Sequence, residues 1–348
     1  MALTRSHIEL ITVGLLGVFA VFIFPQIVQF YTVISSTIYI SLAILALSLA
    51  LIWGYGGILC FGQAAFFGLG GYAYAIGAWN FDATIYGALL AVVVPALFAA
   101  ALGYFMFYGR LNDVYLGVIT LTVTLILFKL VNSTGGEAWA IGKAKLGGFN
   151  GMPGTPLLEN PFDGQVLSPQ ALYMLAAALL FVCYFGCKFL LASRFGRIVV
   201  AIRENETRAE LLGYDARPYK LIFFCVGAGI AGISGMLFAN AVFVAPTMFD
   251  MASTARILIW VIVGGLGTLV GPVLGCIGLL IITTYLGKAG FVDPNVALGV
   301  ILILFVLIVP RGLLPLLDDA LAWVLSRLRG PADQTSPSHE ESTKRRAS

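Results

Sequence analysis

The chain consists of long apolar runs that short polar stretches separate. A helix needs about 20 apolar residues to cross a bilayer, and most of the runs approach that length. The runs are continuous rather than alternating, which argues against the strands of a membrane barrel. The pattern predicts an all-α, polytopic integral membrane protein with about 8–10 transmembrane helices. The predicted spans cover residues 8–30, 31–53, 83–108, 114–131, 171–191, 221–242 and 296–309.

Two glycine-rich stretches interrupt this pattern. Residues 54–71 hold seven glycines in eighteen positions. Such a stretch favours either a broken helix that lines a solute pathway or close helix packing alone. Residues 255–286 would extend about 48 Å as one helix, whereas two full crossings need about 60 Å. We therefore expect residues 255–286 to form a pair of short segments or a re-entrant hairpin.

A charged stretch at residues 194–220 stands between two apolar runs. It carries ten charged side chains in 27 residues, too many to lie in hydrocarbon. Its apolar positions recur at helical spacing, which indicates ordered amphipathic helices rather than a solvated loop. Asn205 is a good N-cap for a second short helix, Glu206 suits its first turn, and Gly213 can end it.

The placement of basic residues predicts the orientation. One arrangement puts fifteen of the twenty lysines and arginines on a single side, which the positive-inside rule makes cytoplasmic. Residues 194–220 and both termini then face the cytoplasm, and the long polar connection at residues 132–170 faces out. We expect a membrane domain over residues 1–329 and a disordered cytoplasmic tail over residues 330–348.

The composition excludes several kinds of chemistry. Charged residues make up 11% of the chain, against about 25% in soluble domains. All five cysteines lie in apolar segments without a nearby histidine, so we expect packing roles and no metal site or disulfide. No catalytic constellation or phosphate-binding loop is present, and the spans lack the ionisable groups of ion-coupled carriers. The chain is therefore not expected to be an enzyme, and any energy for transport must come from another protein.

Three segments together carry a family resemblance. LIWGYGGILCFGQAAFFGLGGYA, RFGRIVVAIRENETRAELLGYDARPYKL and IWVIVGGLGTLVGP resemble, in that order, the permease subunits of bacterial ABC importers for branched-chain amino acids. The resemblance covers about residues 31–310. The urea and short-amide permeases of the same group are similar, so they remain an alternative. A passive channel or facilitator for a small neutral solute is a further alternative.

The resemblance also implies partners and sites. A second permease, two cytosolic ATPases and an extracytoplasmic solute-binding protein would assemble with this chain in the inner membrane of a bacterium, in contact with lipid. ATP and Mg²⁺ would bind the ATPases, so no cofactor, metal or nucleic acid is expected on this chain. The expected ATPase-coupling helix comprises Glu204, Asn205, Glu206, Arg208, Ala209, Glu210, Leu211, Leu212 and Gly213.

Polar and aromatic groups near the glycine-rich breaks suggest a solute pathway. We expect these groups to approach a central cavity at the interface with the second permease, because they stand out in otherwise apolar spans. The candidate residues are Gln63, Phe66, Phe67, Thr120, Thr124 and Asn240.

The predicted orientation has a direct test. Cysteines introduced at Gly147 and at Glu206 should react with a membrane-impermeant thiol reagent from opposite sides, with Gly147 outside. Reaction of both from the same side would contradict the orientation.

Overall fold

The fold is all-helical in the computed structural model, apart from one two-stranded ribbon. The structure describes residues 29–289 without 82, 137, 138, 161 and 162, together with a few isolated positions outside that range. The helices are α3 (Phe30–Leu49), the π-helix η2 (Ala50–Tyr55), α4 (Gln63–Asn80), α5 (Thr84–Tyr108), α6 (Asp113–Ser133), α7 (Pro169–Ala192), α8 (Arg194–Glu204), α9 (Glu206–Leu211), α10 (Ala216–Ala241), α11 (Met251–Gly264) and α12 (Val270–Ala289). The short elements are β1 (Ala140–Ile141), β2 (Ala144–Lys145), η3 (Gly148–Asn150) and η4 (Pro246–Phe249).

Six helical segments of the described residues are long and apolar enough to cross a membrane. They confirm the runs that begin near residues 31, 83, 114, 171 and 221, and they add α12. The expected spans at residues 8–30 and 296–309 lie outside the described part of the chain, as does the tail at 330–348. The six segments are Phe30–Tyr55, Thr84–Tyr108, Asp113–Ser133, Pro169–Ala192, Ala216–Ala241 and Val270–Lys288.

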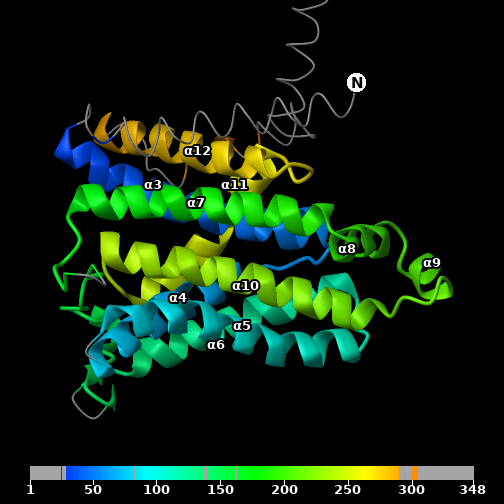
Figure 1. Cartoon of the computed structure of the whole chain (residues 1–348), viewed down its shortest axis with the longest axis horizontal. Helices are drawn as coiled ribbons and strands as arrows, with labels where there is room; N and C mark the ends of the chain where they lie inside the picture. The colour runs from blue at the N-terminus through cyan, green and yellow to red at the C-terminus, as the bar shows by residue number, and fades with distance from the viewer. Residues whose placement is uncertain are drawn as a thin grey trace, which may run out of the picture.

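The long helices lie side by side along the bundle, which has two distinct ends (Figure 1). Helices α8 and α9 protrude from one end, here called the hairpin end. The connection between α6 and α7 covers the other, here called the loop end, and includes β1, β2 and η3. The charged stretch and the long polar connection therefore lie at opposite ends of the bundle.

Helices α4, α5 and α10 pack with unusually close backbones. The α-carbon of Gly70 on α4 faces the backbone of Gly232 on α10 with no room for a β-carbon. Gly232 in turn lies against the carbonyl of Ala91 on α5, and Pro95 Cγ is 3.0 Å from where a β-carbon would stand. Helices in a membrane gain stability from such close contact, because lipid offers no hydrophobic drive for their association.

The chain leaves helical geometry at two places inside the bundle. Residues 56–62 enter from the hairpin end before α4, and the N–H of Phe61 donates to Thr120 Oγ1 at 3.1 Å. Residues 242–250 enter from the loop end before α11, with η4 inside them. Irregular backbone at membrane depth is tolerated only where protein or water satisfies its polar groups. Helices α4 and α11 consequently begin in the interior of the bundle, from opposite directions.

The region 255–286 forms two helices, as its length predicted. Helix α11 runs toward the hairpin end, where the carbonyl of Leu266 lies against Gly54. Helix α12 returns to the loop end, where Tyr39 and Thr284 share a hydrogen bond of 2.8 Å between their hydroxyls. Of the two helices, α11 is too short to span a bilayer alone, at 14 residues and about 21 Å.

The outer helices present an apolar surface suited to lipid. Leu89 and Leu97 on α5 and Tyr115 and Ile126 on α6 are each more than half exposed. Helix α3, in contrast, is completely buried over its last seven residues, 43–49. Exposed apolar side chains on spanning helices are stable in hydrocarbon, which indicates that lipid or another membrane subunit covers α5 and α6.

The structure improves the choice of position for the labelling test. Gly147 has φ 69°, and a β-carbon there would collide with the carbonyl of Gly151. Asn150 is exposed on the same connection and tolerates a side chain. Cysteines at Asn150 and at Glu206 should therefore label from opposite sides of the membrane, measured with an impermeant maleimide on intact and permeabilised cells. The parent chain is the control, since four of its five cysteines are buried.

Candidate functional site

The protruding hairpin is an ordered structure with capped helices. Helix α8 begins where Ser193 Oγ accepts a hydrogen bond from the N–H of Gly196 at 3.2 Å. Its buried side is made of Gly196, Val199 and Ile202. Side-chain caps satisfy N–H groups that a helix leaves unpaired, and each contributes about 1 kcal/mol. The hairpin therefore holds a defined shape outside the spanning helices.

Helix α9 forms the tip of the hairpin and confirms the expected cap. Asn205 Oδ1 accepts from the N–H of Arg208 at 2.8 Å, and the chain turns at Gly213 with φ 90°. Ala209 was expected to contact an ATPase, but it is only 4% exposed and packs against Ile202 and Ala216. That expectation was wrong for Ala209, because the small residue faces the inside of the hairpin and joins α9 to α8 and α10.

An ion pair fastens α9 to the start of α10. Lys220 Nζ lies 2.6 Å from Glu206 Oε2, with the two side chains 15% and 48% exposed. Asp215 Oδ1 caps α10 by accepting from the N–H of Arg217 at 3.1 Å. An ion pair with this exposure contributes about 0–1 kcal/mol, so its main effect is on the angle of α9.

The base of the hairpin touches the first unwound stretch. Gly57 has φ 67°, which an L-residue adopts with strain, and a β-carbon there would lie 2.8 Å from Arg203 Cγ. Arg203 is near the C-terminus of α8, and Gly57 is the second residue after η2. A displacement of α8 would therefore press on the segment that leads into α4.

The tip of the hairpin exposes apolar side chains. Leu211 is 84% exposed, Leu212 is 73% exposed, and Tyr214 beside them is 42% exposed. Charged groups surround these side chains. Glu204, Arg208 and Glu210 are exposed. Adjacent exposed leucines within a charged rim are characteristic of a protein-docking surface.

The candidate pathway residues are buried within one chain. Gln63 Nε2 donates to Ser48 Oγ at 2.7 Å, while Thr120 and Thr124 bond to backbone carbonyls of their own helix. Phe66 and Phe67 make edge contacts with Phe224 and Phe238, at ring-centroid distances of 5.3 Å each. All six candidates are at most 8% exposed in the single chain, and their role in a pathway stays a prediction.

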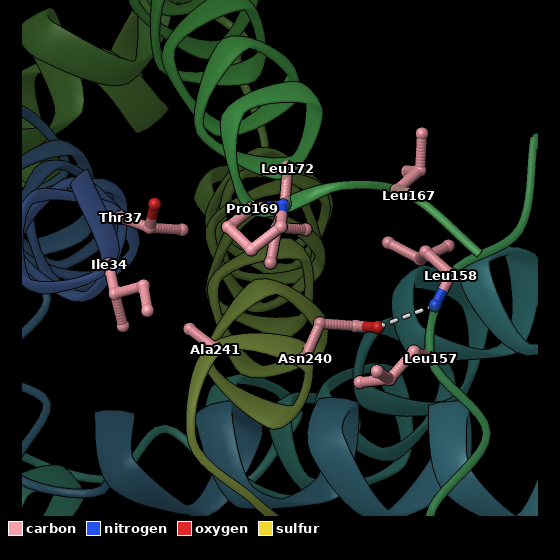
Figure 2. Close-up of a pocket in the computed structure, with 9 residues that line it drawn as sticks. All are labelled: Ile34, Thr37, Leu157, Leu158, Leu167, Pro169, Leu172, Asn240 and Ala241. Carbon is pink, nitrogen blue, oxygen red and sulfur yellow. Dashed lines mark hydrogen bonds between the residues drawn. The ribbon is translucent and has the colours of Figure 1, made fainter. Parts of the chain in front are cut away.

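Asn240 has a different role at the loop end (Figure 2). Its Oδ1 accepts from the N–H of Leu158 at 2.8 Å and from the Tyr74 hydroxyl at 3.2 Å. Its Nδ2 donates to the carbonyl of Met236 at 2.9 Å. One amide thus ties the connection between α6 and α7 to the end of α10.

A pocket of about 150 Å³ lies beside Asn240, between the ends of α3, α7 and α10. Its lining is mostly apolar, with Thr37 and Asn240 as the polar side chains (Figure 2). The Thr37 hydroxyl already donates to the carbonyl of Val33 at 2.9 Å. Since both polar groups have intramolecular partners, the pocket is a packing feature beneath the polar connection rather than a polar binding site.

Arg256 belongs to the first half of α11, and its Nε donates to the carbonyl of Ala252 at 3.2 Å. In the described part of the chain, no group of three or more potential metal ligands comes together. The five cysteines are free thiols, and four of them are buried.

The structural role of Asn240 can be tested by substitution. Asn240→Leu leaves the Leu158 N–H without its acceptor, whereas the Tyr74 hydroxyl keeps the Pro156 carbonyl at 2.9 Å. An unpaired buried group costs about 1–3 kcal/mol. We expect a lower melting temperature of the purified chain in detergent. Thr122→Val is the control, because Thr122 is exposed and bonds only to its own helix. Equal melting temperatures for both variants would contradict the structural role.

Comparisons with known proteins agree with the fold. The profile of a family described as the branched-chain amino acid transport system permease component matches residues 31–309. The chain is 30% identical over 313 residues to the high-affinity branched-chain amino acid transport system permease protein LivM of Escherichia coli, covering 84% of this chain and 72% of that protein. The LivM protein of Salmonella typhimurium is 29% identical, over 78% of this chain and 67% of the relative.

More distant relatives extend beyond the enterobacteria. A probable LivM of Methanocaldococcus jannaschii is 24% identical over 78% of this chain and 90% of its own length. No solved structure matches the chain. The extent of the family match and the identity to LivM show that this chain belongs to the family of permease components of branched-chain amino acid ABC transport systems.

Proposed function

We propose that this chain forms one half of the translocation pathway of an importer for branched-chain amino acids, driven by ATPases that dock on its hairpin. The observation that carries the proposal is the folded, capped hairpin with Leu211 and Leu212 exposed at its tip. Apolar side chains exposed on an ordered tip outside a membrane bundle indicate a docking partner. Membership of the permease family favours an ATPase as that partner.

The proposed assembly contains four kinds of subunit. A second, homologous permease completes the pathway, two cytosolic ATPases bind ATP and Mg²⁺, and an extracytoplasmic binding protein delivers the solute. The hairpin at residues 194–220 and both ends of the chain face the cytoplasm. The connection at residues 132–170 faces the binding protein. The opposite placement of these segments supports this arrangement (Figure 1). One relative, described as the inner membrane ABC transporter permease protein YjfF of Escherichia coli and 27% identical over 45% of this chain, supports a location in the bacterial inner membrane.

Coupling would pass from the ATPase to the unwound segment. Leu211 and Leu212 enter a groove of the ATPase, while Arg208 and Glu210 set the orientation at its rim. Motion of α8 then reaches Gly57 through Arg203 and changes the path of residues 56–62. Because these residues lead directly into α4, the same motion repositions a helix in the centre of the bundle.

Transport assays test the proposed function. The chain should be co-expressed with the second permease and the ATPases of its system, reconstituted in vesicles, and supplied with the binding protein. Uptake of labelled leucine that requires ATP is the expected result. Uptake of urea or an amide instead of leucine would show that the substrate is not an amino acid. Leucine flux without ATP or ATPases would indicate a facilitator.

A charge at the tip of the hairpin should uncouple the importer. Leu212→Asp forces a carboxylate into the ATPase groove, and burying an unpaired charge costs several kcal/mol. We expect transport-coupled ATP hydrolysis and uptake to fall at least about tenfold. The melting temperature of the permease alone should stay unchanged, because Leu212 is 73% exposed in the chain.

The matched control is Thr207→Asp, which adds the same charge to the exposed first turn of α9. An acidic residue in the first turn of a helix is favourable, so α9 should remain folded. A Leu212→Asp importer that assembles and transports at the rate of the Thr207→Asp importer would refute the coupling role.

A further inference from the structure

Two charged side chains lie at the membrane depth of the second unwound segment. Asp250 precedes α11, and the ring of the adjacent Phe249 is 5.7 Å, between centroids, from the ring of Tyr72 on α4. Tyr72 precedes the end of α4 by eight residues, which is about 12 Å along the helix. The 14 residues of α11 then extend about 21 Å toward the hairpin end. Asp250 and Arg256 therefore lie well inside a hydrocarbon core of about 30 Å.

Neither charge has a partner of opposite sign among the described residues. The Asp250 carboxylate makes no side-chain cap bond with α11. The Arg256 guanidinium bonds to the carbonyl of Ala252 at 3.2 Å and to Ser253 Oγ at 3.4 Å. The ion pairs of the described chain lie elsewhere, on the hairpin. An ionised side chain at this depth is costly unless it faces protein, water or a ligand.

The surface next to these groups is open in the single chain. Thr247, Met251, Ala252 and Ala255 are exposed, while Asp250, Ser253 and Arg256 are half-buried. Charges cannot face lipid tails cheaply, so this face of α11 turns toward a water-filled path or another subunit. Along this segment of the described bundle, a carboxylate, a hydroxyl and a guanidinium follow at intervals of three residues. They belong to Asp250, Ser253 and Arg256.

Two further polar atoms flank the same segment without partners. The Tyr72 hydroxyl and the Trp260 indole N–H are buried and make no hydrogen bond in the described part of the chain. Tyr72 touches Phe249 next to Asp250, and Trp260 lies one turn beyond Arg256 on α11. Buried polar groups are normally paired, so orphaned ones mark places where a ligand or water completes the bonding.

We propose that Asp250 and Arg256 form a transient binding site for the zwitterionic head of an α-amino acid within the translocation pathway. The Arg256 guanidinium binds the carboxylate of the solute, for which its paired N–H donors are suited, and the Asp250 carboxylate binds the ammonium group. The chemistry fits a zwitterion better than urea, which carries no charge. This inference rests on the proposed function, because it names the chemical class that the proposed pathway recognises.

Neutral variants in the reconstituted importer test the site. Asp250→Asn and Arg256→Gln should each lower the maximal rate of leucine uptake about tenfold or more, the effect of losing one charged hydrogen bond in transit. The concentration of loaded binding protein that gives half-maximal uptake should change less than about twofold, because docking occurs outside the membrane. Lys129→Gln is the control: it removes an exposed charge from the apolar helix α6 and should leave uptake unchanged.

A double variant separates a solute site from a structural ion pair. If the two residues bind opposite ends of the solute, Asp250→Asn/Arg256→Gln is at least as slow as the slower single variant. If they instead pair with each other during the cycle, removing both is milder than removing one, since no charge is left unpaired. A double variant that transports faster than either single variant would overturn the proposal.

Thiol labelling provides a readout that does not depend on the charged variants. Ser253→Cys is a small change between Asp250 and Arg256. In the assembled importer this cysteine should react with a water-soluble methanethiosulfonate, and excess leucine with binding protein and ATP should slow the reaction. Absence of reaction in every state would place the segment against the second permease and refute the site. A parent importer that carries no leucine at all would refute the proposed function instead.

Discussion

The architecture depends on how backbone groups are satisfied where the chain is not helical inside the membrane. An unpaired N–H or C=O in hydrocarbon costs several kcal/mol, so the two unwound stretches require cover from neighbouring helices. Thr120 provides a hydroxyl for the N–H of Phe61 in the first stretch. In the second, the carbonyl of Val244 accepts from the N–H of Met152 at 2.9 Å. Helix α6 and the connection that follows it therefore supply bonding partners to both unwound stretches.

The two unwound stretches have separate roles in the proposed mechanism, one toward the ATPase and one toward the solute. Residues 56–62 meet the hairpin through Gly57 and Arg203, which is the contact that the proposed coupling uses. Residues 242–250 meet the polar connection at the loop end and lead to Asp250. Phe249 packs against Gly68 and Tyr72, which connects the second stretch to the helix that the first one begins. In the proposed mechanism, helix α4 therefore links ATPase coupling to solute passage.

The sequence predicted the spanning helices well because their signal is local. Continuous apolar runs and the cap residues Asn205 and Gly213 can be recognised without tertiary contacts. Residue roles were harder, because they depend on which face of a helix its neighbours cover. Ala209 looked like part of an apolar docking face, yet it packs within the hairpin. Gln63 and Thr124 looked like pathway groups, yet they bond inside the chain. The start of α11 inside the bundle has no marker in the sequence, so the depth of Arg256 could not be predicted.

The central claim is that the tip of the hairpin is the surface on which an ATPase docks. The most direct measurement places a photoreactive amino acid at Leu211, the most exposed leucine of the tip, in the assembled importer. The same amino acid at Asn150, on the opposite end of the bundle, is the control. An ATPase docked on the tip gives a crosslink from position 211 to the ATPase subunit and none from position 150. No crosslink to the ATPase from position 211, or equal crosslinking from positions 211 and 150, would contradict docking at the tip.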